Sequence, residues 1–358
     1  MMGRLFQGDP PQRRPQPPAE TTFPCRRMTS PAPNTESDIR TALECWYVTG
    51  ATASGKTVVA VELAGRLDAE IVSLDSMAIY RGMDIGTAKP SADQRHQVPH
   101  HLLDIVDPVE EFTVTRYREL ALQTIREIRG RGKRVVFAGG TALYLKALLR
   151  GVFEGPPANQ DFRAAIEDEL QSVPLAALHR RLEQVDPVTA DRVHPHDKRR
   201  IIRALEVFST TGVPISHMQN EFETEHPADD CRVFALRHPR DILHQRIGDR
   251  VDQMFADGLV DEVRGLLDHW GQPGRTAAQA VGYREVIAHL CEGVSLEETR
   301  DRVLVRTRRF ARHQETWFRG LSECRMLDLP RDFAGDPGGA ARIADRIALS
   351  GPPRPSTD

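Results

Sequence analysis

Short apolar runs alternate with segments of helical spacing along the first part of the chain. The runs are rich in β-branched and aromatic residues, as expected for buried strands, and most segments between them repeat apolar residues every three to four positions. This order predicts an α/β fold with a mainly parallel sheet flanked by helices. We expect strands at residues 44–48, 69–74, 101–106 and 133–138, and helices at residues 57–67, 115–129 and 142–149.

The alternation stops near residue 155, and residues 156–225 show helical spacing without a convincing strand. We interpret them as a helical insertion domain within an α/β core made of residues 44–155 and 226–335. After the insertion the pattern predicts a turn into a helix at residues 279–284 and a short helix after Leu329. It also predicts one more strand and two other helices, the second of which opens with a capping box at Ser295. These elements lie at residues 231–236, from 241 onward and at 295–318, and the insertion helices at residues 161–171, 175–182 and 196–211.

The two ends of the chain lack such periodicity. Residues 1–40 hold eight prolines and six arginines, so we expect a disordered extension. No apolar segment of the secretory type follows these arginines. Residues 350–358 are expected to form a disordered tail.

A glycine-rich loop lies between the first expected strand and the first expected helix. It fits the pattern G-x-x-x-x-G-K-[ST], in which backbone N–H groups surround phosphate oxygens, the lysine supplies positive charge and the hydroxyl reaches Mg²⁺. The sequence therefore predicts a P-loop NTPase-like core that binds a diphosphate or a triphosphate. The eight residues are Gly50, Ala51, Thr52, Ala53, Ser54, Gly55, Lys56 and Thr57.

Two polar residues follow neighbouring strands, where an open α/β sheet binds its ligands. Asp75 follows the second strand, and we favour a chemical role for it over the alternative of a helix N-cap. Thr141 follows the pair Gly139-Gly140, which would let the backbone approach a ligand closely, although its hydroxyl could simply cap the next helix. The polar segment 81–90 is expected to be a loop over this site.

Composition narrows the class of protein. The formal net charge is −3 over 358 residues, so a nucleic-acid surface would have to be a local patch. No apolar run approaches the roughly 18 residues of a membrane span. Five scattered cysteines without a C-x-x-C pair indicate a reducing cytoplasm and no zinc site. We expect no metal role for His96, His100 and His101.

Two local patches are strongly basic. Four of six residues from Lys198 are basic, and Arg199 and Arg203 share a helical face that suits a phosphate backbone, although a solvated face is an equal alternative. Between Arg300 and Arg319 there are seven arginines and two acidic residues. We expect this helix to be anchored on the core by an apolar seam and to present arginines to nucleic-acid phosphates. The seam is Val303, Phe310 and Trp317, and the flanking rows are Arg302, Arg306 and Arg309, and Arg308, Arg312 and Arg319.

With these motifs placed, residues 46–320 resemble the tRNA dimethylallyltransferase family. The resemblance implies that the loop holds the diphosphate of dimethylallyl diphosphate through Lys56, Thr57 with Mg²⁺, and Arg250. It further implies that Thr141 hydrogen-bonds the leaving oxygen and that Asp75 accepts a proton from the N6 amine of the adenosine 3′ of the anticodon (A37). The motifs, in order, are GATASGKT, DSMAIYRGMDIGTAKP, GGTALYLKALL, HPHDKRRIIRALEVF, HQRIGDRVDQM, AVGYRE and RTRRFARHQETWFR.

The same resemblance implies contacts with tRNA and extrusion of the target adenine from its stack. It points to a monomeric, cytoplasmic enzyme of bacterial type, because the zinc finger of eukaryotic relatives is absent. The residues that would contact tRNA are Asp75, Ser76, Met77, Ala78, Arg163, Arg199, Arg200, Arg203, Gln279, Gly282, Tyr283, Arg284, Arg312, Gln314, Trp317 and Arg319.

The sequence departs from the family pattern at Ala51, Ala78, His196 and the pair Arg312-His313, none of them a catalytic group. Three other functions fit the phosphate loop: an adenylate isopentenyltransferase, a small-molecule P-loop kinase, and a non-catalytic nucleotide-dependent RNA-binding switch. The two basic patches count against the first, because free AMP or ADP would not need them.

Overall fold

The computed structural model describes residues 36–350 except 153–154, 219–224, 334 and 337. Its centre is a six-stranded sheet in the order β3-β2-β4-β1-β5-β6, and every pairing between neighbouring strands is parallel. The strands are β1 (Trp46–Gly50), β2 (Ala69–Ser73), β3 (His100–His101), β4 (Arg134–Ala138), β5 (Val233–Arg237) and β6 (Cys324–Asp328). The expected α/β fold is confirmed.

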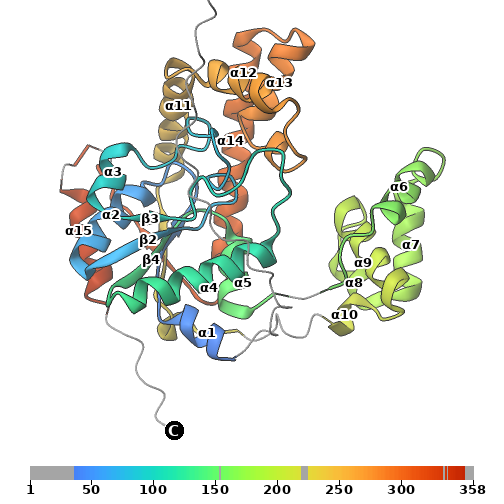
Figure 1. The fold of residues 1–358 in the computed structure, drawn as a ribbon, viewed down its shortest axis with the longest axis horizontal. Helices are drawn as coiled ribbons and strands as arrows, with labels where there is room; N and C mark the ends of the chain where they lie inside the picture. The colour runs from blue at the N-terminus through green and yellow to red at the C-terminus, as the bar shows by residue number, and fades with distance from the viewer. Residues whose placement is uncertain (1–35, 153–154, 219–224, 334, 337, 351–358) are drawn as a thin grey trace, which may run out of the picture. The chain divides into compact units, whose positions relative to one another are not determined.

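Helices cover both faces of this sheet (Figure 1). Along β1, Tyr47 packs into one apolar cluster with α4 and α5, whereas Trp46 and Val48 pack into another with α2 and α15. Because both faces are buried, β1, β4 and β5 contain runs of consecutive apolar residues instead of alternating apolar and polar ones. The helices outside the insertion are α1 (Glu36–Leu43), α2 (Lys56–Leu67), α3 (Ala92–Gln97), α4 (Val114–Gly130), α5 (Ala142–Arg150), α11 (Arg240–Ala256), α12 (Leu259–Trp270), α13 (Tyr283–Glu292), α14 (Leu296–Arg319) and α15 (Gly339–Ala348), with short 3-10 turns η2 (Ala228–Asp230) and η3 (Ala277–Gln279).

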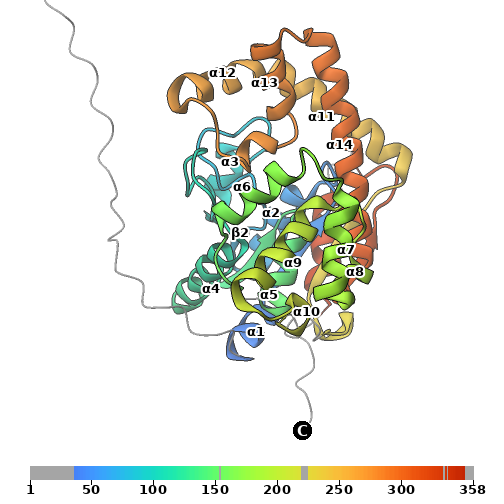
Figure 2. The same ribbon diagram turned by 90° about the vertical axis from the view of Figure 1, so that its right-hand side faces the viewer.

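The segment expected to be a helical insertion contains only helices and loops in its described residues. Figure 2 shows three of these helices, α7, α8 and α9, packed side by side. They share an apolar cluster that includes Leu178, Leu182, Ile201 and Leu205. The periodicity did not predict the short helices α8 and α10. The bounds are α6 (Gln160–Glu169), α7 (Leu175–Val185), α8 (Pro187–Arg192), α9 (Lys198–Thr211) and α10 (Ile215–Met218).

The N-terminal boundary and one strand differ from the sequence prediction. Helix α1 begins at Glu36 and buries Ala42, so the expected disorder of residues 36–40 is wrong, while residues 1–35 lie outside the described part. The strand expected at residues 101–106 is reduced to β3, because Leu102 and Asp104 have φ of +58° and +55° and turn the chain out of the sheet. Helix α12 and strand β6 were not predicted.

No helix among the described residues combines the length and the apolarity that crossing a bilayer requires. The expected tail is described only at Ser350, and residues 351–358 lie outside the described part.

Candidate active site

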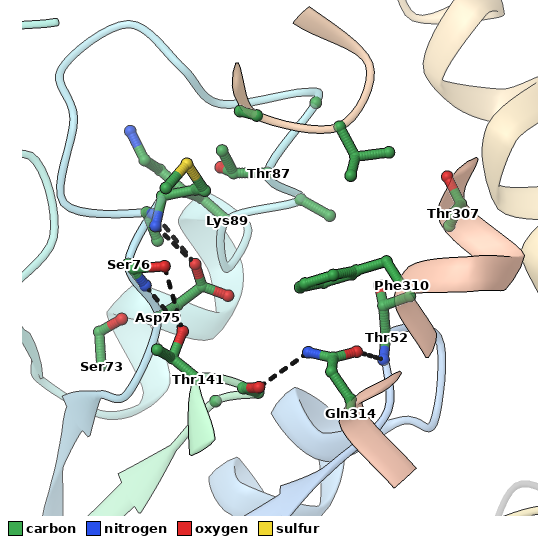
Figure 3. A pocket seen from close by; sticks show the side chains of 18 of the residues that line it. Thr52, Ser73, Asp75, Ser76, Thr87, Lys89, Thr141, Thr307, Phe310 and Gln314 are labelled. Carbon is green, nitrogen blue, oxygen red and sulfur yellow. Dashed lines mark hydrogen bonds between the residues drawn. The ribbon is translucent and has the colours of Figure 1, made fainter. Parts of the chain in front are cut away.

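A cavity of about 520 Å³ lies at the carboxyl ends of β1, β2 and β4. Its wall is built by the phosphate loop, residues 75–78, the segment 86–90 and the turn 139–141, together with side chains from α11, α13 and α14. Figure 3 shows Asp75, Thr141 and Gln314 around this cavity. The topology therefore brings together the two strand-end residues and the glycine-rich loop that the sequence singled out.

The phosphate loop has the expected strand–loop–helix geometry. Gly50 has φ of +134°, and a Cβ there would lie 2.5 Å from the carbonyl oxygen of Leu236, so glycine is required. Gly55 adopts φ of +86° immediately before α2, which begins at Lys56. Ala53 is also left-handed, at φ of +62°. The N-terminus of α2 thus opens directly behind the loop, an arrangement that favours a bound anion.

The floor of the cavity carries more positive than negative charge. Nζ of Lys56 donates a hydrogen bond to the carbonyl oxygen of Ala51 at 2.7 Å. Loss of hydration and the nearby Arg250 guanidinium lower the pKa of Lys56 to about 7, against the opposing influence of Asp75. Burial likewise lowers the pKa of Arg250, again opposed by Asp75. Burial disfavours the charged form of both side chains, and a bound anion would favour it. The two lowered pKa values therefore indicate an anion-binding site.

Arg246 adds a third cation beside the loop. Its Nε donates to the carbonyl oxygen of Ala53 at 2.7 Å, which ties α11 to the phosphate loop. Burial lowers the pKa of Arg246. Arg246 and Arg250 are one helical turn apart on α11, but only Arg250 lines the cavity. This placement favours an anion site at Arg250 over a salt-bridged helix surface.

Asp75 follows β2 and is held by the backbone after it. Its Oδ1 accepts hydrogen bonds from the N–H groups of Met77 at 2.8 Å and Ala78 at 3.3 Å. Residues 76–79 form a bend and a turn, so Asp75 does not cap a helix, as the alternative required. Oδ2 of Asp75 has no hydrogen bond to any described residue and is available to a substrate.

The hydroxyl of Thr141 connects the turn after β4 to the turn after β2. Oγ1 accepts the N–H of Ser76 at 3.0 Å and donates to Oγ of Ser76 at 3.3 Å. Thr141 is the residue that precedes α5, but its hydroxyl caps no N–H of that helix. The capping alternative is therefore wrong, and the hydroxyl lies beside the residue that follows Asp75.

The glycine pair before Thr141 serves the packing of the protein. A Cβ on Gly139 would lie 2.2 Å from the carbonyl oxygen of Leu74, and one on Gly140 would lie 2.3 Å from Nε2 of Gln314. The sequence predicted that this pair lets the backbone approach a ligand. Protein atoms occupy the side on which each Cβ would lie, but both glycines also line the cavity, so the approach of this backbone to a ligand stays a prediction.

The arginine-rich helix α14 is anchored differently from the prediction. Its buried positions are Thr299, Val303, Ala311, Gln314 and Phe318. Phe310 and Trp317, expected in the apolar seam, are 45% and 40% exposed. Figure 3 shows that Phe310 points toward the cavity. The buried face is therefore rotated away from Phe310 and Trp317, and it includes a polar residue, Gln314.

Gln314 uses both ends of its amide. Oε1 accepts the N–H of Thr52 at 2.8 Å, and Nε2 donates to the carbonyl oxygen of Gly140 at 2.8 Å. The resemblance placed Gln314 among the tRNA contacts, but the structure shows a side chain engaged with the protein backbone.

The arginines of α14 fall into two groups. Arg306 donates to Oε1 of Glu285 at 2.6 Å and to the carbonyl oxygen of Gln279 at 2.8 Å, so its guanidinium is already bound within the protein. Arg312 and Arg319 are exposed and form no ion pair with any described residue, as a phosphate-binding role requires.

Several residues of the insertion that were predicted to contact tRNA form ion pairs within the protein. Glu206, fully buried, binds Arg163 at 2.8 Å and Arg203 at 2.6 Å. Burial alone would raise the pKa of Glu206, but these hydrogen bonds hold it below its ordinary value. Arg200 pairs with Asp197 at 3.5 Å, and Arg199 lines the cavity. Arg163 and Arg203 are therefore structural, and a contact with tRNA remains a prediction for them.

A residue that the sequence analysis missed holds the loop over the cavity. Glu262 of α12 accepts the N–H groups of Asp84 at 2.9 Å, Ile85 at 2.7 Å and Gly86 at 3.3 Å. It also accepts the hydroxyl of Tyr283 at 2.6 Å. No sequence signal pointed to Glu262, because α12 itself was not predicted and its partners are backbone groups.

The motif around Tyr283 shapes one wall of the cavity. Gly282 has φ of +94° and donates its N–H to Glu285 at 2.9 Å, which starts α13. Tyr283 and Gln279 line the cavity, while Arg284 is exposed. Met77 and Ala78 also line it, as does Thr57 from the first turn of α2.

A phosphate loop, an excess of buried cations and a facing carboxylate on a parallel sheet define an enzyme that acts on a phosphorylated substrate. The sequence model of the IPP transferase family matches residues 78–321. A tRNA dimethylallyltransferase of Rhodopirellula baltica is 50% identical over 288 residues, 78% of this chain and 86% of the relative. One of Geobacter sulfurreducens is 47% identical, over 80% of this chain and 92% of the relative. The chain belongs to the IPP transferase family, and the resemblance is confirmed.

Solved structures agree with this membership. The tRNA isopentenylpyrophosphate transferase of Bacillus halodurans is 38% identical, with a TM-score of 0.60 over 86% of this chain and 96% of that one. A eukaryotic dimethylallyltransferase acting on tRNA is 26% identical, with a TM-score of 0.70 over 87% of this chain and 81% of that one.

Proposed function

We propose that this protein transfers a dimethylallyl group from dimethylallyl diphosphate to the N6 amine of A37, the adenosine 3′ of the anticodon in tRNA. The observation that carries this proposal is the arrangement of one cavity in which the cations Lys56 and Arg250 lie near the carboxylate of Asp75. The family membership and the exposed arginines of α14 support tRNA as the acceptor.

In this reaction the bond between N6 and the allylic carbon forms while the carbon–oxygen bond to the diphosphate breaks. The bonding electron pair leaves with the diphosphate, whose charge Lys56 and Arg250 balance. The hydroxyl of Thr141 can turn from the long 3.3 Å contact with Ser76 toward the leaving oxygen. Oδ2 of Asp75 accepts the proton of the amine, while its Oδ1 stays anchored to the turn.

The donor groups present fit Mg²⁺ bound together with a diphosphate. Thr57, in the first turn of α2, offers a hydroxyl oxygen at the cavity wall. Mg²⁺ is usually held by one or two protein oxygens, with phosphate oxygens and water completing its shell. When bound, the ion would add positive charge against the diphosphate. We also propose that the protein acts as a monomer in the cytoplasm.

The test is incubation with unmodified tRNA and either allyl-labelled dimethylallyl diphosphate or γ-labelled ATP. We expect label in tRNA only from the allyl donor. Phosphate transfer from ATP without prenylation would establish a kinase instead. A parallel incubation supplies AMP with the labelled allyl donor, and label entering AMP but not tRNA would establish an adenylate isopentenyltransferase. Nucleotide-dependent tRNA binding that Asp75→Ala retains, without prenylation by the unsubstituted chain, would establish a non-catalytic switch.

A further inference from the structure

One buried amide connects the two turns that the proposed chemistry uses. Gln314, 7% exposed, accepts the N–H of Thr52 in the phosphate loop and donates to the carbonyl oxygen of Gly140. The distances are both 2.8 Å. Figure 3 shows the two bonds on opposite sides of the amide. Gln314 thus links the phosphate loop directly to the turn that carries Thr141, beside the hydrogen bond from Thr49 at the end of β1 to the carbonyl oxygen of Gly139.

The bridge needs an amide in particular. Thr52 N–H requires an acceptor and the Gly140 carbonyl requires a donor, and among side chains of this length glutamine offers one of each without having to take up a proton. A glutamate would place an oxygen against the Gly140 carbonyl, and a methionine would leave both backbone groups unpaired. An unpaired buried backbone group is costly, so the two turns would shift to find other partners.

The glycine at position 140 is fitted to this amide. A Cβ there would lie 2.3 Å from Nε2 of Gln314 and 3.3 Å from the carbonyl oxygen of Gly50. No positive φ requires glycine at this position. The absence of a side chain at residue 140 is therefore explained mainly by the space that the Gln314 amide takes.

We propose that Gln314 is a positioning residue that holds the phosphate loop in register with Thr141, and that it is not a tRNA contact. The inference rests on the proposed function, since it gives the loop a diphosphate to bind. Gln314 lies two positions from Arg312, which is exposed. One helix would then present arginines to RNA and, from its buried face, set the geometry of the diphosphate site.

The experiment measures two affinities of the full-length chain: for inorganic diphosphate with Mg²⁺ by calorimetry, and for unmodified tRNA by fluorescence anisotropy. Gln314→Met should weaken diphosphate binding about tenfold, as expected when buried groups lose their hydrogen bonds. It should leave tRNA binding within about twofold. The matched variant Arg312→Ala should show the opposite pattern, with tRNA binding weakened and diphosphate binding retained.

A reduced tRNA affinity with unchanged diphosphate affinity in Gln314→Met would overturn the inference and make Gln314 an RNA contact. Unchanged values of both would also overturn it. Failure of the unsubstituted chain to bind diphosphate would overturn the proposed function, and the inference with it. If the unsubstituted chain binds diphosphate and Gln314→Met loses only that affinity, the inference is supported.

A second pair of variants keeps the inference testable if Gln314→Met does not fold. Gly140→Ala should weaken diphosphate binding in the original chain, because its methyl group displaces the amide. In the background of Gln314→Ala, where the space is free, the same change should cost at least threefold less. Equal costs in both backgrounds would show that Gly140 does not act through Gln314, and would reject the proposed bridge.

Discussion

Two clusters in this protein each combine two cations with one carboxylate, but they differ in whether these charges form ion pairs. In the insertion, Arg163 and Arg203 share the buried carboxylate of Glu206, which also accepts the N–H of Asn159 at 2.8 Å. At the cavity floor, Lys56 and Arg250 have only Asp75 among them, and both have lowered pKa values. A carboxylate bound directly by both guanidinium groups stabilises the fold, whereas two buried cations without an ion pair to the described carboxylate are prepared for an anionic ligand.

The largest expected effect tests what the carboxylate in the cavity does. Asp75→Asn should reduce turnover by roughly 10²–10⁴-fold, the range for a lost general base, while tRNA affinity stays within a few-fold. Single-turnover prenylation and anisotropy give the two values. If the change instead tightens diphosphate binding and leaves the rate intact, Asp75 is only a counter-ion, like Glu206.

The next effect concerns the ion pairs around Glu206. Glu206→Gln should destabilise the fold by about 3 kcal/mol, because two guanidinium groups lose a buried partner. Denaturant unfolding measures it. The matched control is Glu167→Gln, which breaks the exposed pair with Lys198 and should cost less than about 1 kcal/mol. Equal costs for both variants would remove the structural role of Glu206.

A third effect follows from the pKa of Lys56, about 7 in the free protein. A bound diphosphate favours the charged ammonium, so affinity is full below this pKa and falls by up to about tenfold per pH unit above it. Calorimetry with inorganic diphosphate and Mg²⁺ between pH 6 and 9 measures this. Lys56→Arg, which stays charged, should flatten that part of the curve; parallel curves would show that Lys56 is not the titrating group.

The smallest effect separates exposed arginines from arginines that already bind a carboxylate of the protein. Arg312→Ala should weaken tRNA binding a few-fold and reduce the slope of log affinity against log salt by about 1, because one phosphate contact is lost. Arg163→Ala should leave that slope unchanged, since its guanidinium already binds Glu206. Equal reductions for the two variants would restore Arg163 as an RNA contact.

Local patterns in the sequence predicted much of the core. The phosphate loop needs a fixed order of glycines and a lysine between a strand and a helix, and β1 and α2 lie where that order places them. Asp75 and Thr141 follow β2 and β4, and parallel strands bring their carboxyl ends to one edge. These predictions depend only on short-range spacing and on the rule for parallel sheets.

The remaining assignments depended on partners far away in the chain. Seven arginines between Arg300 and Arg319 look alike in the sequence, yet Arg306 is held by Glu285 while Arg312 is exposed. Glu262 bonds to backbone N–H groups about 177 residues earlier, and no residue pattern records such partners.

The sequence by itself determined the chemistry that the protein can carry: a phosphate loop, a strand-end carboxylate and an excess of arginine in α14. Only the tertiary structure decided which of these charged and polar groups are available. Gln314 was expected at the RNA surface and lies between Thr52 and Gly140 instead. The physical reason is that a buried amide must satisfy both its donor and its acceptor, and the backbone groups that do so come together only when the chain has folded.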